Sequence, residues 1–208
     1  MLDHRYGPRM RLRDLPVPVS PAARAAFAVA SAYHSPSLLN HSVRSHLWAA
    51  AIGISCGIEF DDELLYVSAL LHDLGLVEAF DNHALPFEEA SGHVARVFGA
   101  GAGWPPDRCL RAAEVIVQHM RGAVDPAADP EGHLLERATA LDISGRQIDL
   151  VAPELRREVL QEWPRLSLAA EFGACFAQQA ARKPESAAGA AVSSGVAQRL
   201  ADNPLEKE

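Results

Sequence analysis

The sequence predicts an all-α protein, a compact bundle of six to eight helices. Apolar residues recur three and four positions apart along most of the chain, which is the spacing of one helix face. Prolines stand at the starts of these segments and glycines just past their ends, as helices prefer. Stretches with the alternating pattern of a β-strand are almost absent. At 208 residues, 49% of them hydrophobic, the chain can close one sizeable core, so we expect a single domain.

The first four expected helices are marked by caps, stops and apolar spacing. Ser20 is a suitable N-cap before Pro21, and Pro36 stops that first helix. The third helix follows an aspartate cap and ends at Gly75, and apolar residues cover most of its circumference, so we expect it to be central and buried. The fourth starts at Pro86. Their expected ranges are about 21–33, 37–55, 61–75 and 86–101.

The remaining helices are bounded in the same way. The fifth starts at Pro105 or Pro106, and the sixth opens at the Asp-Pro pair before residue 131 and closes near Gly145. Pro164 separates the last two helices. Their expected ranges are about 106–122, 130–145, 152–163 and 165–183.

We expect three parts along the chain. Residues 1–19 form an N-terminal extension, and residues 20–183 form the helical domain, with its core motifs between residues 35 and 150. Residues 184–208 are rich in small and polar residues, which predicts a flexible C-terminal tail with at most a short helix near 196–201.

Composition excludes several classes of partner. The formal net charge is -8 and the basic residues are scattered, so nucleic acid is a poor candidate. No stretch reaches about 18 uncharged apolar residues, which argues against a membrane segment. The three cysteines, Cys56, Cys109 and Cys175, lie far apart and form no disulfide or metal pattern. We therefore expect reduced thiols and a cytoplasmic protein.

The segment ALLHDLG places His72 and Asp73 side by side at the end of the apolar third helix. Burying a carboxylate costs several kcal/mol unless it is paired or bound to a metal. Both side chains can converge on one ion beside the helix end, and the ion would supply the missing positive charge. The pair therefore predicts a metal site.

Further ligands are expected on other helices. His41 lies in the first turns of the second helix with Arg44 three residues on, and Asp142 is in phase with the apolar face of the sixth helix. Two imidazoles and two carboxylates suit one divalent ion such as Zn, with Fe, Mn, Co or Ni as alternatives. An open coordination position would favour hydrolysis or hydration over a structural role.

The motifs NHSVR, LLHDLG, FEEASGHVA, VIVQH and ALDISG, in this order on a helical background, resemble the HD superfamily of metal-dependent phosphohydrolases and related enzymes. They are more specifically similar to its cyanamide hydratase-like branch. The sequence departs from that branch at Ser91-Gly92, where Gly-Ala is usual, and at Met120, where Thr is common. These departures affect the expected substrate pocket and leave the metal motifs intact.

The resemblance implies a role for each matching residue. The implied metal ligands are His41, His72, Asp73 and Asp142. The implied catalytic residues are Asp73, His119 and Arg44, and His119 would also contact the substrate together with Glu88 and Phe87. Water activated by the ion would be the nucleophile, and Asp73 or His119 would carry its proton.

The function expected from this branch is hydration of a small nitrile or cyanamide-like molecule. Hydrolysis of a nucleotide or another phosphoester is the alternative from the wider superfamily, and a non-catalytic HD module that binds metal is a second one. The acidic chain with few basic residues near the motifs favours the small neutral substrate. The expected partner is this small molecule alone, and assembly into a homo-oligomer is left open.

The other histidines receive weaker interpretations. A lone histidine near a helix end, such as His119, is often only a favourable dipole partner, and Arg44 or Glu88 could be ordinary surface charges. His93 could support a dinuclear site like that of the diiron members of the superfamily. The remaining histidines are expected to be solvated: His4, His34, His46, His83 and His133.

Overall fold

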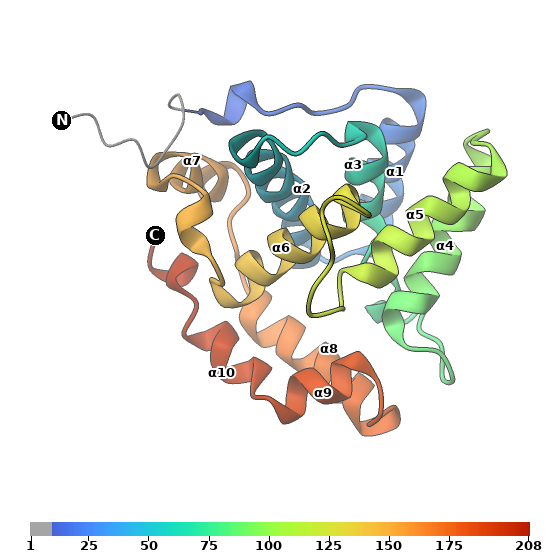
Figure 1. The fold of residues 1–208 in the computed structure, drawn as a ribbon. Helices are drawn as coiled ribbons and strands as arrows, with labels where there is room; N and C mark the ends of the chain where they lie inside the picture. The colour runs from blue at the N-terminus through green and yellow to red at the C-terminus, as the bar shows by residue number, and fades with distance from the viewer. Residues whose placement is uncertain (1–9) are drawn as a thin grey trace.

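The structure is a computed structural model that describes residues 10–208, and it is built from ten α-helices and four short 3-10 helices (Figure 1). Within that range no strand occurs, so the prediction of an all-α fold is confirmed. The helices are α1 Pro21–Tyr33, α2 Pro36–Cys56, α3 Asp62–Leu71, α4 Phe87–Gly101, α5 Pro106–Gln118, α6 Pro130–Ser144, α7 Pro153–Glu162, α8 Leu168–Arg182, α9 Ala187–Ser193 and α10 Val196–Ala201. The 3-10 helices are η1 Leu12–Asp14, η2 Leu74–Leu76, η3 Ile148–Leu150 and η4 Pro204–Lys207.

Side-chain caps start the helices that build the domain. The Ser20 hydroxyl accepts the backbone N–H of Ala23 at 3.0 Å, and Ser35 caps α2 in the same way. Asp61 and Asp129 cap α3 and α6 with their carboxylates. Each cap satisfies a backbone donor that the first turn leaves free, which is why these boundaries were predictable.

The third helix is shorter than expected. It ends at Leu71, and Asp73 leaves the helical conformation with φ -106° and ψ 7° before η2 begins. Every residue from Leu64 to Leu71 is buried, so the expected central position of α3 is confirmed. The early end turns the His72-Asp73 pair out of the helix and into a tight corner of the core.

Helix α2 runs through the middle of the domain, in contact with α1, α3, α6 and α8 (Figure 1). Its residues from Ser42 to Gly53 are buried without interruption, including Trp48 and Arg44 at 0% exposure. A helix buried all round must carry its polar groups into the core, where each needs a partner.

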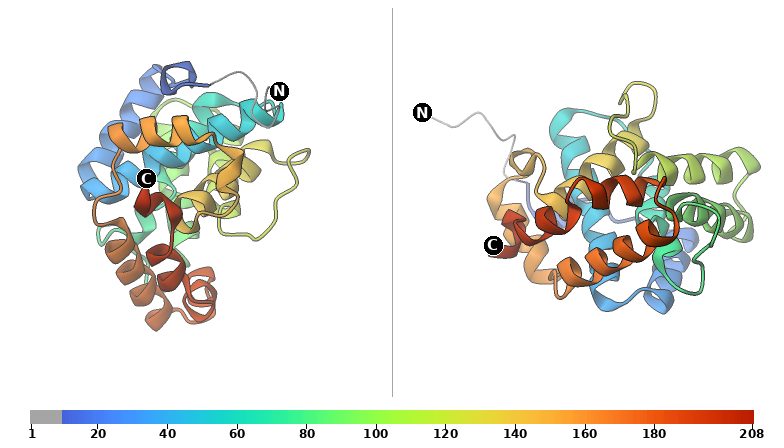
Figure 2. Two further views of the ribbon diagram at one scale, coloured as in Figure 1. Left: turned by 90° about the vertical axis from the view of Figure 1, so that its left-hand side faces the viewer. Right: turned by 90° about the horizontal axis from the view of Figure 1, so that it is seen from below.

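The C-terminal segment corrects the prediction of a flexible tail. Residues 184–208 form α9, α10 and η4, which lie with α8 along one side of the domain (Figures 1 and 2). Leu200 and Asn203 are fully buried and Leu205 is 3% exposed. The short helix expected near 196–201 is present as α10, whereas α9 and η4 were not expected. Helices of six or seven residues are not stable by propensity alone, so both α9 and α10 depend on packing against the domain. These extra helices also raise the count above the expected six to eight.

Two apolar clusters hold the fold together. The larger one lies among α1 to α7, and the smaller one joins the start of α2 and η2 to α8, α9 and α10. Phe87, Phe172 and Phe176 belong to the smaller cluster. Among the residues from 10 onward, no helix has the length and apolar character needed to span a bilayer.

Candidate metal centre

Three side chains from two segments converge in the core and are named here the metal triad: His41 of α2 with His72 and Asp73 after α3. The Nε2 atoms of the two histidines lie 3.3 Å apart. Asp73 Oδ2 lies 3.4 Å from His41 Nε2 and 3.2 Å from His72 Nε2. Ligands about 2.1 Å from a common ion are separated by roughly 3.0–3.4 Å, so the triad has the spacing of a metal site.

The carboxylate of Asp73 gives an independent reason for a cation. It is fully buried, and neither oxygen has a hydrogen-bond partner among the described residues. Burial raises the pKa of Asp73, but the charge and contacts of His72 and His41 outweigh this and hold the pKa well below its usual value. When both imidazoles are neutral, as metal binding requires, their positive charge is absent, and a carboxylate at this depth is then stabilised by a bound cation; the residues present fit one.

Both histidines are oriented for metal binding by hydrogen bonds at their other ring nitrogen. His72 Nδ1 donates to the Ala69 carbonyl at 2.6 Å, and His41 Nδ1 donates to Asp142 Oδ2 at 2.7 Å. With Nδ1 protonated, each ring presents an Nε2 lone pair to the interior of the triad. The neutral form of each ring therefore has the tautomer that a metal requires. Burial lowers the pKa of His41, but its contacts with Asp142 and Asp73 outweigh this and raise it, so a metal ion would displace a proton from Nε2.

Asp142 lies on the opposite side of the His41 ring from the triad. Its Oδ1 accepts Arg44 Nε and Trp48 Nε1, both at 2.8 Å, and its Oδ2 accepts Arg44 Nη2 and His41 Nδ1, both at 2.7 Å. Burial raises the pKa of Asp142, but the adjacent Arg44 charge outweighs it and keeps the pKa well below normal. These four bonds use the lone-pair positions of the carboxylate. Asp142 thus braces His41 here, and its role as a fourth ligand stays a prediction.

Arg44 faces Asp142 and the chain between α7 and α8. Besides its two bonds to Asp142, its Nη1 donates to the carbonyls of Trp163 at 3.0 Å and Pro164 at 3.1 Å. The side chain is 0% exposed, so the interpretation as an ordinary surface charge is wrong. Its contacts brace the site, and the catalytic role implied by the resemblance stays a prediction.

The expected substrate residues lie beside the triad. The ring of His119, at the end of α5, has its centroid 4.8 Å from that of His72 and 5.8 Å from that of Phe87. His119 Nδ1 bonds the Ile116 carbonyl, which leaves Nε2 free to meet a ligand. Burial and the neighbouring His72 lower the pKa of His119 to about 3, so the ring is neutral near pH 7.

Glu88 is also placed with this group. It is 7% exposed, and its Oε2 is buried without a partner within the described residues. Burial is the main cause that raises the pKa of Glu88, and the charge of Asp73 acts in the same direction. A surface role is therefore wrong for Glu88.

Two residues that the sequence did not single out cover the triad. Phe172 of α8 packs edge-on against His41 with centroids 5.5 Å apart, and Phe176 lies 5.4 Å from Phe87. The two phenylalanines stack on each other at 4.4 Å. Their spacing of four residues marks one helix face, but nothing local shows that this face covers a metal centre. The wall over the site is therefore aromatic.

Two histidines expected in solvent are buried. His46 is 0% exposed, and its Nε2 lies 2.9 Å from the Pro16 carbonyl. His34 is 8% exposed, and neither ring nitrogen has a partner among residues 10–208. Both predictions failed because the residues lie where α1 and α2 pack on other elements, which periodicity alone does not reveal.

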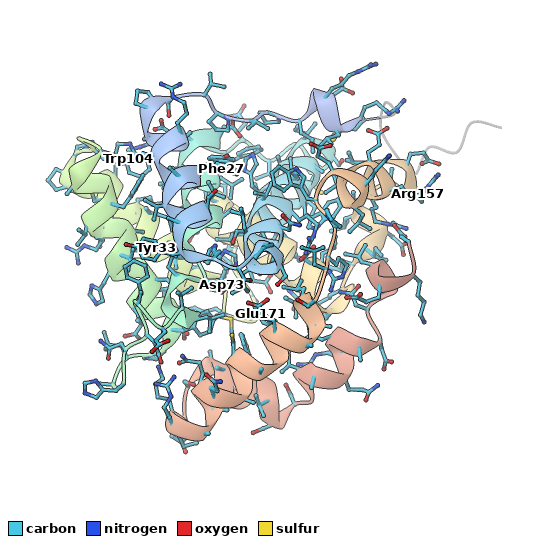
Figure 3. The ribbon with its side chains drawn as sticks, turned by 180° about the vertical axis from the view of Figure 1, so that it is seen from behind. Phe27, Tyr33, Asp73, Trp104, Arg157 and Glu171 are labelled. Carbon is cyan, nitrogen blue, oxygen red and sulfur yellow. The ribbon has the colours of Figure 1, made fainter. Side chains whose placement is uncertain are left out.

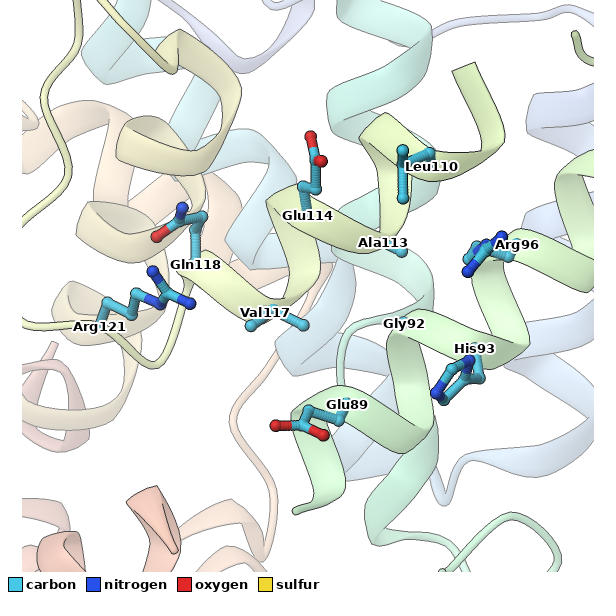
Figure 4. A pocket seen from close by; sticks show the side chains of 10 residues that line it. All are labelled: Glu89, Gly92, His93, Arg96, Leu110, Ala113, Glu114, Val117, Gln118 and Arg121. Atoms are coloured by element: carbon cyan, nitrogen blue, oxygen red, sulfur yellow. The ribbon is translucent and has the colours of Figure 1, made fainter. Parts of the chain in front are cut away.

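The other histidines are remote from the triad or lie outside the description. His83 is exposed, His133 is partly buried with Nδ1 2.6 Å from the Val124 carbonyl, and His4 falls outside the described residues. His93 is exposed in a groove between α4 and α5, together with Arg96 and Arg121 (Figure 4). A dinuclear site that uses His93 is therefore not supported.

Comparison with known proteins agrees with this geometry. The family model described as HD domain matches residues 38–151, more than half of the chain, and the chain belongs to the HD domain family. Two relatives from Saccharomyces cerevisiae, cyanamide hydratase DDI2 and cyanamide hydratase DDI3, are each 29% identical over 175 residues. The matched region covers 82% of this chain and 77% of each relative. The resemblance to the cyanamide hydratase-like branch is confirmed, and the chain is a metal-dependent HD-family hydratase or hydrolase.

Proposed function

We propose that this enzyme adds water across the carbon–nitrogen triple bond of a small, neutral nitrile or cyanamide-like molecule. Oxygen bonds to the carbon, protons pass to the nitrogen, and an amide is released, which for cyanamide is urea. A divalent ion held by the triad would lower the pKa of a water molecule and so supply the nucleophile. Zinc is the proposed ion.

The observation that supports a neutral substrate is the state of the cations around the site. Arg44 is paired with Asp142, as described above. Arg165 donates to Glu206 at 2.6 Å, and Lys183 donates to two backbone carbonyls at 2.7 and 2.8 Å, with Asp81 3.6 Å away. Phosphate recognition uses cations that are free to donate several charge-assisted hydrogen bonds. Each of these three cations already has a carboxylate or carbonyl partner, and among their side-chain nitrogens only Arg165 Nη2 has none within the described residues.

The remaining residues suit a small substrate with one polar end. Phe87, Phe172 and Phe176 exclude water from the apolar wall. Neutral His119 can accept a hydrogen bond at Nε2 from the attacking water or from an N–H of the substrate. In this proposal Asp73 or His119 takes a proton from the water and passes it to the substrate nitrogen.

The test combines metal analysis with a substrate screen. Protein purified without chelator is expected to hold one divalent ion per chain by elemental analysis, and to convert cyanamide or a short nitrile to its amide. His72→Ala is expected to lose both the metal and the activity, whereas the exposed His83→Ala retains both. Phosphate release from p-nitrophenyl phosphate with no hydration would overturn the proposed substrate. Full metal content without either activity would favour a binding module.

A further inference from the structure

His34 is a buried histidine without a hydrogen bond. Its backbone N–H closes the last turn of α1 on the Ala30 carbonyl at 2.9 Å, and the next residue, Ser35, caps α2. The side chain is 8% exposed, yet both Nδ1 and Nε2 lack a partner among the residues from 10 onward. Buried polar groups are nearly always paired, so an imidazole with two free nitrogens calls for an explanation. His46, which is 0% exposed, differs in that its Nε2 bonds the Pro16 carbonyl, so that only its Nδ1 is without a partner among the described residues.

The neighbours of His34 in the chain contact two segments that flank the metal triad. The Tyr33 ring packs on Phe80, in the segment that follows Asp73, with centroids 4.7 Å apart. The Ser37 hydroxyl donates to Glu171 on α8. His34 therefore lies between the segment that follows Asp73 and helix α8, whose Phe172 packs on His41. Figure 3 labels Tyr33, Asp73 and Glu171 in this corner of the molecule.

Electrostatics agree with this placement. The charges of Asp73, His72 and His41 all act on His34, which puts its ring within electrostatic reach of the triad. Burial is the larger effect and lowers the pKa of His34 to about 4, so the imidazole is neutral near pH 7. A neutral imidazole offers one N–H donor and one acceptor.

We propose that His34 is a substrate-contacting residue of this site, and that one of its ring nitrogens hydrogen-bonds the polar end of the substrate and of the amide product. An amide or urea presents both a carbonyl acceptor and an N–H donor, so whichever ring nitrogen faces the ligand has a partner on it. The chemical identity of the ligand rests on the proposed function, whereas the position of His34 in the site does not.

The first test uses substitutions. His34→Phe keeps the ring shape and removes both nitrogens, and it is expected to lower kcat/KM at least about fivefold while one metal ion per chain is retained. Its melting temperature is expected to stay the same or rise, because an unpaired buried polar group is removed. His34→Gln restores a donor and an acceptor and should recover part of the activity. His46→Gln is the matched control, since it changes an equally enclosed histidine away from the triad.

The second test observes the His34 ring in the wild-type protein by NMR. It separates the proposed role of His34 from the proposed substrate class. With 15N-labelled histidine, urea is expected to shift the ring signals of His34 and leave those of His46 in place. If inorganic phosphate shifts His34 and urea does not, the proposed substrate fails and the role of His34 stands. The role of His34 is overturned if neither ligand moves its signals, or if His34→Phe keeps full kcat/KM.

Discussion

The buried pair between Arg44 and Asp142 is expected to make a large contribution to stability. Both side chains are 0% exposed, and the guanidinium makes two bonds to the carboxylate and two to backbone carbonyls. Arg44→Met would leave the Asp142 carboxylate with two of its four hydrogen-bond donors. The carbonyls of Trp163 and Pro164 would also lose the hydrogen bonds that Arg44 donates to them. Removing one member of a buried ion pair costs about 3–5 kcal/mol. For a chain of this length, this loss lowers the melting temperature by roughly 6–20 °C.

The assay is thermal and urea unfolding of the metal-free protein, so that loss of the ion does not contribute to the result. Arg108→Met is the matched control: Arg108 also pairs with two carboxylates, those of Asp61 and Glu63, but its side chain is 25% exposed. An exposed pair of this kind is worth less than about 1 kcal/mol. Equal costs for the two substitutions would refute the reasoning.

A double variant and a metal titration complete this test. Arg44→Met combined with Asp142→Leu is expected to regain much of the lost stability, because no unpaired charge remains buried. In the single variant Asp142 loses the guanidinium that fixes it and so holds the His41 ring less firmly, and metal affinity is expected to fall by about 10–100-fold. Unchanged affinity would show that the brace behind His41 does not support the metal site.

Three further changes test other parts of the fold. Burial lowers the pKa of His46 to about 4, so the unfolded chain takes up a proton below pH 6.5 that the folded chain does not. The free energy of unfolding should fall by up to about 3 kcal/mol as the pH drops from 6.5 to 4, and urea titrations of His46→Gln should show a flatter dependence than the wild type. Asn203→Ala removes a buried hydrogen bond to the backbone of α6 and should lower the free energy of unfolding by about 1–3 kcal/mol in the same urea titration. An unchanged urea midpoint would mean that the C-terminal segment does not support the domain. In Gly75→Ala the new Cβ would lie 2.1 Å from the Phe87 carbonyl oxygen, so the free energy of unfolding is expected to fall by about 1–3 kcal/mol, and the rate of substrate hydration is expected to fall as well. Gly101 has open space around it, so Gly101→Ala is the control and is expected to change neither.

The metal site shows how far sequence analysis reaches. His72 and Asp73 could be identified because a charged pair at the end of an apolar helix is costly without a cation, and His41 followed from its place on α2. The metal triad confirms that these three come together. Asp142 is a metal ligand if it lies on the Nε2 side of the His41 ring and a brace if it lies on the Nδ1 side. His41 and Asp142 are 101 positions apart in the chain, so no local sequence pattern shows which side Asp142 occupies.

By itself, the sequence determined the all-α class, the caps and stops of the main helices, and the motifs that define the family. These features depend on residues within one or two turns of each other, so a spacing rule can detect them. Only the tertiary structure decided that α8 covers the triad with Phe172, that residues 184–208 pack on the domain, and that His34 is buried. The physical reason is that helical periodicity shows which face of a helix avoids water, whereas the element that covers this face is chosen by packing across the whole chain.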